Sequence, residues 1–407
     1  MRAAVHIALF VVGWVAVQAL VQPALPLPAL EDLQPKLEHL TEAADEYTAV
    51  AIGSSRVFRE VIPDVFDEQM RLLGRRHKLF NLGAKGMRVP EAVVILEWLL
   101  ERRPANLELV IFELTDCDPF LDTRNEMADR EIAWHTWGAT RRAVEGAWTD
   151  PDTRVGDRER AEASVMHLRH WLARFAATGR GRELVPLLER GQPGDSVREP
   201  MDLVKYMRIT QGWVPLEAEM QAGYQARQDH YRGHIPEYFE RVKDLRNKRD
   251  VPIPMSAYEV ALIERVRELC AGHGLQLVFV IMPSLTVEAD LLGAQGRGEL
   301  PELLVFNDPR RYPFFYKPDS RWDAAHLTRP ASRVFTGRLV AEVAALLGFG
   351  PTPALGLPAD TPVEPDDDVG ADGAASGDAR GAGVDTGAPI DDEPTHADEP
   401  PAGDEPR

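Results

Sequence analysis

Thr48-Ala-Val-Ala-Ile-Gly-Ser-Ser-Arg-Val57 is a short apolar run that ends in a small-residue turn with two adjacent serines. A continuous apolar run of this length is typical of a parallel strand buried on both faces. The glycine lets the backbone turn sharply, so that the next side chains stand at the edge of the sheet. In open α/β sheets, ligands bind beyond the carboxyl ends of the strands. Ser54 and Ser55 are therefore candidate nucleophiles, although Gly-Ser-Ser is also common in ordinary turns.

Four further apolar runs predict strands, at residues 79–82, 107–114, 275–282 and 303–306. Helical patterns fall between or before them, at 90–103 and 257–271, and a final helix follows Thr328 and ends at Gly348. Alternating strands and helices predict an α/β fold in which helices cover both faces of a parallel sheet.

A second group of candidate residues lies in Arg321-Trp-Asp-Ala-Ala-His-Leu-Thr328. Asp323 and His326 are three residues apart, which lets the carboxylate hold one imidazole nitrogen while the other faces a nucleophile. The same spacing also suits a helix-capping pair. An early serine at a strand end, combined with this pair, favours the reading as a Ser-His-Asp set.

These two blocks, together with the turn Asn81-Leu-Gly-Ala-Lys-Gly86, resemble the SGNH/GDSL hydrolase superfamily. The chain looks closest to the membrane-anchored bacterial branch, whose first block reads Gly-Ser-Ser and whose relatives handle acyl groups on cell-envelope polymers. The resemblance covers residues 48–116 and 255–348. It implies a three-layer α/β/α, flavodoxin-like sheet interrupted by a helical insertion.

The resemblance also implies roles for individual residues. Ser55 would be the nucleophile, His326 its general base and Asp323 the group that orients the histidine. The amide of Gly86, together with that of Ser55, would bind the oxyanion, and Gly83 is a near neighbour that could take the place of Gly86.

The third block of the family pattern is missing. The family would show Gly-x-Asn-Asp after the third strand, whereas this chain has Glu113-Leu-Thr-Asp-Cys117 and offers no asparagine. The loss of one oxyanion donor costs about 3 kcal/mol of transition-state stabilisation. Thr115 and Asn307 are the two candidates to replace it, and the sequence does not rank them.

Two functions of different class follow. The first is a serine esterase or O-acyltransferase that acts on esters of a cell-envelope glycan, polymer or small acyl substrate and needs no cofactor or metal. A membrane acyltransferase partner is implied by the resemblance alone. The second is a catalytically silent scaffold of the envelope that keeps the fold. Phosphate binding by residues 81–86 is weaker, because no Walker Lys-Ser/Thr pair follows, and nothing in the sequence indicates a nucleic-acid partner.

The N-terminus predicts a membrane anchor. Residues 3–21 are mostly apolar and close to the length of about 20 residues that spans a bilayer. Arg2 precedes this stretch and Glu31 follows it, which predicts an inner-membrane protein with a single N-terminal span and its body in the periplasm of a Gram-negative cell. Val17-Gln-Ala19 is an alternative site of signal cleavage.

Residues 117–254 lack clear strands and are too long for a structureless loop, so they predict a helical insertion that caps the strand ends. Five of the eight tryptophans lie there, and residues 160–178 are amphipathic. The basic residues are predicted to form a solvated face, in preference to a surface for an anionic substrate or membrane; they include Lys205, Arg208, Arg227 and Arg232. His135 between two tryptophans is predicted to be a packed residue.

The chain thus divides into an anchor or signal (1–30), two parts of an α/β domain (31–116 and 255–350), the insertion between them (117–254) and a tail (351–407). The tail has 15 acidic residues, two arginines and no aromatic residue, so it carries most of the net charge of −19 and cannot build a core. Cys117 and Cys270 are either a disulfide pair or two buried thiols.

Overall fold

The computed structural model describes residues 2–21, 25, 30, 32–115, 117–121, 129–149, 155–181, 184–185, 189, 201–218, 222–248 and 253–349. The tail (351–407), the prolines that follow the apolar N-terminal stretch, and position 116 lie outside these residues. The prediction of an acidic, coreless tail therefore stays a prediction.

Five parallel strands form a single sheet in the order β2-β1-β3-β4-β5. They are β1 (Ala49–Gly53), β2 (Leu79–Gly83), β3 (Leu109–Glu113), β4 (Gln276–Ile281) and β5 (Leu303–Val305). The predicted parallel sheet is confirmed. Strand β3 is shorter than the apolar run 107–114 because its register with β1 and β4 begins at Leu109. In this strand order the chain reverses direction across the sheet at β1 and β3, where open α/β sheets bind ligands.

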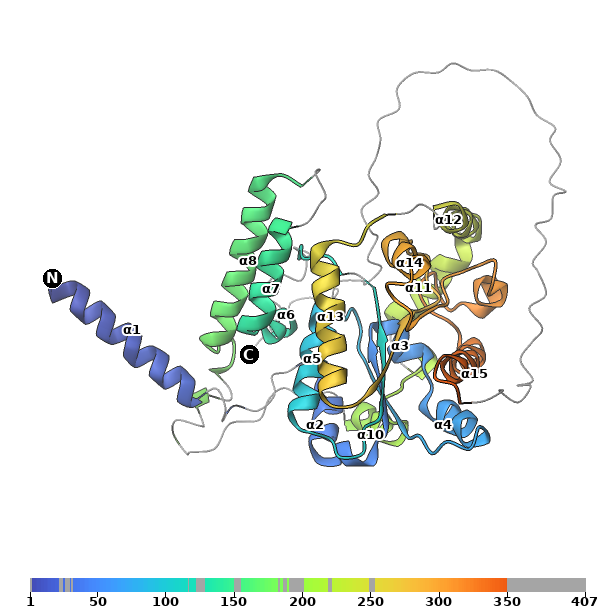
Figure 1. Cartoon of the computed structure of the whole chain (residues 1–407), viewed down its shortest axis with the longest axis horizontal. Helices are drawn as coiled ribbons and strands as arrows, with labels where there is room; N and C mark the ends of the chain where they lie inside the picture. The colour runs from blue at the N-terminus through green and yellow to red at the C-terminus, as the bar shows by residue number, and fades with distance from the viewer. Residues whose placement is uncertain are drawn as a thin grey trace, which may run out of the picture.

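Helices cover both faces of the sheet, which makes the three layers predicted from the sequence (Figure 1). One face carries α2 (Leu33–Ala43), α5 (Val89–Glu101), α13 (Ala257–Gly272) and α14 (Ala289–Gly296). The other carries α3 (Ser55–Glu60), α4 (Pro63–Leu72), α12 (Ile235–Lys248) and α15 (Arg329–Leu346). Side chains of β1 alternate between the two cores: Val50 and Ile52 pack on the first, Ala49 and Ala51 on the second.

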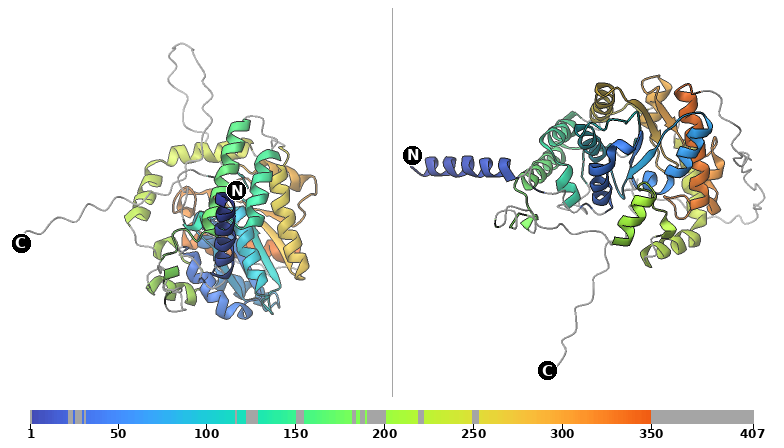
Figure 2. Two further views of the ribbon diagram at one scale, coloured as in Figure 1. Left: turned by 90° about the vertical axis from the view of Figure 1, so that its left-hand side faces the viewer. Right: turned by 90° about the horizontal axis from the view of Figure 1, so that it is seen from below.

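The first part of the insertion forms an additional layer outside α5 and α13. It consists of α6 (Asp129–Trp134), α7 (Trp137–Thr149) and α8 (Asp157–Phe175), with α8 on the outside (Figures 1 and 2). A Cβ atom at Gly146 of α7 would stand 2.5 Å from the ring of Tyr258 on α13, so the glycine allows the two helices to meet closely. The elements described in this half are helices, and they pack against the helices α5 and α13.

The second part of the insertion lies along edge strand β2 and against α3. It contains α10 (Met201–Ile209), the 3-10 turn η4 (Leu216–Ala218) and α11 (Ala222–Gly233). The amide of Asn81 on edge strand β2 donates to Gln211 O at 2.8 Å, and Trp213 Nε1 donates to Arg59 O at 2.8 Å. The segment after α10 therefore satisfies backbone groups that an open edge strand would leave to solvent or to other chains.

Short 3-10 turns complete the described elements: η2 (Ala44–Glu46), η5 (Pro313–Tyr316) and η6 (Pro318–Ser320). The N-terminal stretch forms α1 (Arg2–Val21), which projects from the body beside α8 (Figure 2). Trp14 of α1 packs edge-on against Phe175 of α8, with ring centroids 5.1 Å apart. Within the described residues, no helix combines the length and the apolar character that crossing a membrane requires.

The two cysteines are buried thiols and do not form a disulfide with each other. Cys270 lies on α13 with 1% of its surface exposed. Burial raises the pKa of its thiol to about 12, so this cysteine is an inert core residue at neutral pH.

Candidate active site

The two serines in the turn after β1 occupy different structural positions. Ser54 stands at the N-cap of α3, where its Oγ accepts from the amide of Arg56 at 3.2 Å and its own amide donates to Glu113 Oε2 at 2.6 Å. A Cβ at Gly53 would lie 2.5 Å from Glu113 Oε2, so only glycine lets this carboxylate reach the turn. Ser54 is therefore a capping residue. Ser55, the first residue of α3, is partly exposed.

Ser55 is the serine that meets the histidine. His326 Nε2 lies 2.8 Å from Ser55 Oγ, and His326 Nδ1 lies 3.0 Å and 3.1 Å from the two carboxylate oxygens of Asp323. Asp323 and His326 are buried, with 4% and 5% of their surfaces exposed. The structure thus brings together the three residues that the sequence singled out, in the order nucleophile, base and orienting carboxylate.

The loop that carries the pair is shaped by the carboxylate itself. Asp323 Oδ1 accepts from the amides of Ala325 and His326, both at 2.8 Å. Burial alone would raise the pKa of Asp323, but His326, Arg227 and the Ala325 amide outweigh it and hold the pKa well below its usual range. The carboxylate is therefore charged at neutral pH, and it stabilises the imidazolium that forms when the histidine accepts a proton.

A buried link holds the serine helix and the histidine loop in register. Glu60, the last residue of α3, accepts from the amide of Leu327 at 3.1 Å, next to His326. Thr336 of α15 donates to Glu60 O at 2.9 Å and accepts from the amide of Ile62 at 3.0 Å. Burial raises the pKa of Glu60 to about 8, so its carboxyl is largely neutral at pH 7 and adds little charge beside the histidine.

The glycine amides predicted as oxyanion donors differ in whether they already donate a hydrogen bond within the protein. The amide of Gly83 donates to Asn81 Oδ1 at 3.0 Å, so it is already used within the turn. Gly86 is exposed and has a φ of 60°, a left-handed conformation that glycine adopts without strain. Among the described residues, no acceptor bonds to the amide of Gly86 or to that of Ser55. Of the two glycines, Gly83 thus already donates its amide within the turn, and the assignment of Gly86 as an oxyanion donor stays a prediction.

The region of the missing third block is filled by charged groups. Glu113 Oε1 accepts from Arg56 Nε at 3.0 Å, and Arg56 Nη2 donates to Thr115 Oγ1 at 3.0 Å. Thr115 in turn donates to Glu288 Oε1 at 3.1 Å. Asn307, the other candidate, donates through Nδ2 to Thr286 O at 3.1 Å. Both candidate replacements for the family asparagine thus already serve as donors to protein groups.

Arg227 is the site residue that sequence reasoning placed wrongly. It was predicted on a solvated face, yet its Nη2 lies 3.0 Å from Asp323 Oδ2 and only 16% of its side chain is exposed. No local pattern could reveal this, because α11 and the histidine loop are far apart in the chain. Arg56 and Glu113 were likewise missed as site residues, although their places after β1 and at the end of β3 are a usable signal.

Three buried histidines lie apart from this site, in the insertion. His135 Nε2 lies 3.0 Å from His167 Nδ1, and the rings of His135 and His170 stack with centroids 4.7 Å apart. His135 is packed as predicted, with contacts at both ring nitrogens. Within the described ranges, no cluster of three His, Cys, Asp or Glu side chains could hold a metal ion.

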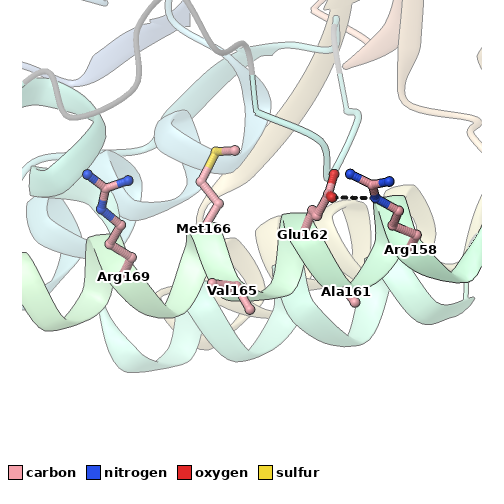
Figure 3. A pocket seen from close by; sticks show the side chains of 6 residues that line it. All are labelled: Arg158, Ala161, Glu162, Val165, Met166 and Arg169. Carbon is pink, nitrogen blue, oxygen red and sulfur yellow. Dashed lines mark hydrogen bonds and ion pairs between the residues drawn. The ribbon is translucent and has the colours of Figure 1, made fainter.

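A shallow hollow on the outer face of α8 is lined by different kinds of side chain from those of the Ser55 site (Figure 3). It is lined by six residues of that single helix: Arg158, Ala161, Glu162, Val165, Met166 and Arg169. Arg158 and Glu162 pair across one helical turn at 2.8 Å. The hollow contains no hydroxyl, thiol or imidazole, and its one carboxylate, Glu162, is paired with Arg158, so the Ser55 site remains the candidate active site. No protein-family model and no curated protein sequence matches this chain.

Proposed function

We propose that the protein is a serine esterase or O-acyltransferase of the SGNH type, acting on ester-linked acyl groups of a cell-envelope glycan or polymer. The observation that carries this proposal is the 2.8 Å separation of Ser55 Oγ and His326 Nε2, with Asp323 behind the histidine. Hydrogen-bonded nucleophile, base and orienting group are the parts that acyl transfer through a covalent intermediate requires. The anchor at residues 3–21, the periplasmic location and an acyltransferase partner remain parts of this proposal that rest on the sequence.

The first half-reaction forms an acyl-enzyme. Ser55 Oγ attacks the ester carbonyl carbon while His326 Nε2 takes its proton, and the carbonyl oxygen becomes an oxyanion. The amides of Ser55 and Gly86 are the donors assigned to that oxygen. When the tetrahedral intermediate collapses, the C–O bond to the alcohol breaks and His326 returns the proton to the leaving oxygen.

The second half-reaction releases the acyl group. His326 takes a proton from water or from a glycan hydroxyl, whose oxygen attacks the acyl-serine carbonyl. Collapse of the second tetrahedral intermediate breaks the bond to Ser55 Oγ, which regains its proton from His326. Water gives hydrolysis and a glycan hydroxyl gives transfer. Asp323 keeps its charge throughout and stabilises the imidazolium.

A silent scaffold is the second candidate, and one observation favours it. Glu113 holds a carboxylate 2.6 Å from the amide of Ser54, beside the place where the family pattern has an uncharged oxyanion donor. Negative charge near a developing oxyanion opposes catalysis. Arg56 pairs with Glu113 at 3.0 Å and compensates this charge in part.

Labelling with a fluorophosphonate separates the two candidates. Full-length protein should be labelled covalently, Ser55→Ala and His326→Ala should abolish labelling, and Ser54→Ala should leave most of it. The same variants should behave alike with a small activated ester as substrate. Labelling that survives Ser55→Ala but disappears in Ser54→Ala would disprove the assignment of the nucleophile. No labelling of the unmutated protein would support the scaffold.

A further inference from the structure

The insertion contributes a charged group to the pair Asp323 and His326, here called the dyad. Arg227 on α11 places Nη2 3.0 Å from Oδ2 of Asp323, the oxygen that His326 Nδ1 approaches at 3.1 Å. The other oxygen, Oδ1, accepts from the amides of Ala325 and His326 and from Nδ1 at 3.0 Å. One carboxylate is therefore shared between the guanidinium and the imidazole.

The position of Arg227 is held by packing behind it. Tyr231, one turn further along α11, meets Tyr238 of α12 edge-on with ring centroids 5.2 Å apart. Tyr238 donates its hydroxyl to Tyr316 O at 3.0 Å, and both tyrosine side chains belong to the same core as Leu327, which follows the histidine. The helix that carries Arg227 and the loop that carries the dyad therefore form one packed unit.

Among the described residues, Arg227 and His326 are the side chains that form ion pairs with Asp323, at 3.0 Å each. Ser55 faces the histidine from α3, and Glu60 bonds the adjacent Leu327 amide with a carboxyl that is largely neutral at pH 7. Tyr231 interacts electrostatically with Asp323, with Asp319 and with Arg321, but burial raises its pKa, so it too is neutral. Arg321 donates to Phe315 O at 2.7 Å and interacts with Glu60 and with the tyrosines Tyr231, Tyr238 and Tyr316.

We propose that Arg227 is a positioning residue of the active site: it orients Asp323 and weakens the hold of that carboxylate on a protonated His326. A positive charge next to the dyad disfavours the imidazolium, so it keeps His326 in the neutral form that can act as a base. The helical insertion is thus part of the catalytic unit. The consequence for catalysis rests on the proposed function, whereas the effect on the histidine's protonation does not.

The first test measures protonation directly. Full-length Ser55→Ala protein with ¹³Cε1-labelled histidine is titrated by NMR, and the His326 resonance is assigned with His326→Gln. Adding Arg227→Met should raise the titration midpoint of His326, because it removes a positive charge 3.0 Å from the carboxylate that holds the histidine. Arg227→Lys should leave the midpoint of His326 close to its value in the Ser55→Ala protein, because lysine keeps the positive charge. Arg232→Met is the matched control, because Arg232 is an exposed residue of the same helix.

The second test asks whether protonation limits reactivity. In protein with Ser55 intact, Arg227→Met should slow fluorophosphonate labelling about tenfold at pH 6 and only a few-fold at pH 9. A residue with a merely structural role would lower the rate equally at every pH. Arg227→Gln provides a second neutral variant if Arg227→Met melts at a lower temperature than the unmutated chain.

The two tests keep this inference separate from the proposed function. An unchanged or lowered His326 midpoint in both neutral variants would disprove the role of Arg227, whatever the labelling shows. A raised midpoint in a protein that is not labelled at any pH would support the electrostatic role of Arg227 and refute the enzymatic function. A raised midpoint with a rate loss that is the same at every pH would refute the catalytic consequence alone.

Discussion

Ser55 and His326 are 271 positions apart in the chain, and their Oγ and Nε2 atoms are 2.8 Å apart in the structure. The register between them is maintained by Glu60, which ends the helix that Ser55 begins and bonds the amide beside His326. The sheet edge thus supplies the nucleophile, and the segment before the last helix supplies the base.

Replacing the capping serine should affect stability more than chemistry. Ser54→Ala removes the Oγ that accepts from the Arg56 amide at 3.2 Å, and the loss of an N-cap costs about 1 kcal/mol. Ser54→Gly should lower the free energy of unfolding by only about a few tenths of a kcal/mol, since glycine is tolerated at N-caps. Denaturant unfolding measures both values. Equal stability of Ser54→Ala and the unmutated protein would contradict the capping role.

Removing the charge of Asp323 should disable the histidine without unfolding the protein. We expect Asp323→Asn to lower kcat/KM for an activated ester by about 10³–10⁴-fold, because an amide cannot stabilise the imidazolium in the same way. Asp319→Asn, at an exposed position of η6, is the matched control. The effects of Asp323→Asn and Ser55→Ala should not add, since these residues act as a unit. Additive losses would contradict a shared mechanism.

A glycine at the end of β2 should be intolerant of any side chain. A Cβ at Gly83 would stand 2.4 Å from the backbone nitrogen of Phe58, which cannot move without shifting α3. Gly83→Ala should therefore destabilise the fold by about 1–3 kcal/mol or more. Gly272→Ala, where a Cβ meets nothing within 4 Å, should be neutral or slightly stabilising. Thermal melting of both variants provides the comparison, and equal melting temperatures would contradict the close approach.

The paired histidines of the insertion predict acid sensitivity. Burial lowers the pKa of both His135 and His167 below the ordinary histidine value of 6.5, and for His167 the pKa falls to about 4. The neighbouring His167 lowers the pKa of His135 further. Both are neutral when folded, so the unfolded chain binds more protons below pH 6.5 and stability falls as pH drops from about 6.5 towards 4. One such group removes about 2 kcal/mol by pH 5. Melting temperatures at pH 8 and pH 5 report this loss.

Variants of single histidines test the assignment of this acid sensitivity. His167→Gln should reduce the difference between the melting temperatures at pH 8 and pH 5, because it removes one of the buried groups that titrate. His273→Gln, at an exposed site, should leave the difference unchanged. An equal pH dependence in all three proteins would place the acid-sensitive groups elsewhere.

Deleting residues 351–407 should leave the body folded. The tail cannot offset its chain entropy by apolar burial, since it contains no aromatic residue and is rich in Asp, Gly and Pro. We expect the melting temperature of the truncated chain to match that of the full chain within about 2 °C. A large decrease would show that the tail packs on the domain.

Much of the architecture could be predicted from the sequence because its signals are local. Short apolar runs predicted each of the five strands to within two residues, and their alternation with helical patterns predicted the covered parallel sheet, which is confirmed. Asp323-x-x-His326 and Gly53-Ser54-Ser55 are local as well, since strand ends and turns select their own residue types. These patterns sufficed to select three residues that meet in space.

Only the tertiary structure decided between residues that look alike in the sequence. Ser54 and Ser55 are both small hydroxyl residues in one turn, and the start of α3 makes the first a cap while the second faces His326. Arg227 is one of many arginines in a charged insertion, and the docking of α11 against the core makes it a partner of Asp323. The physical reason is range: backbone conformation follows from neighbouring residues, whereas the pairing of buried charges depends on segments that only folding brings together.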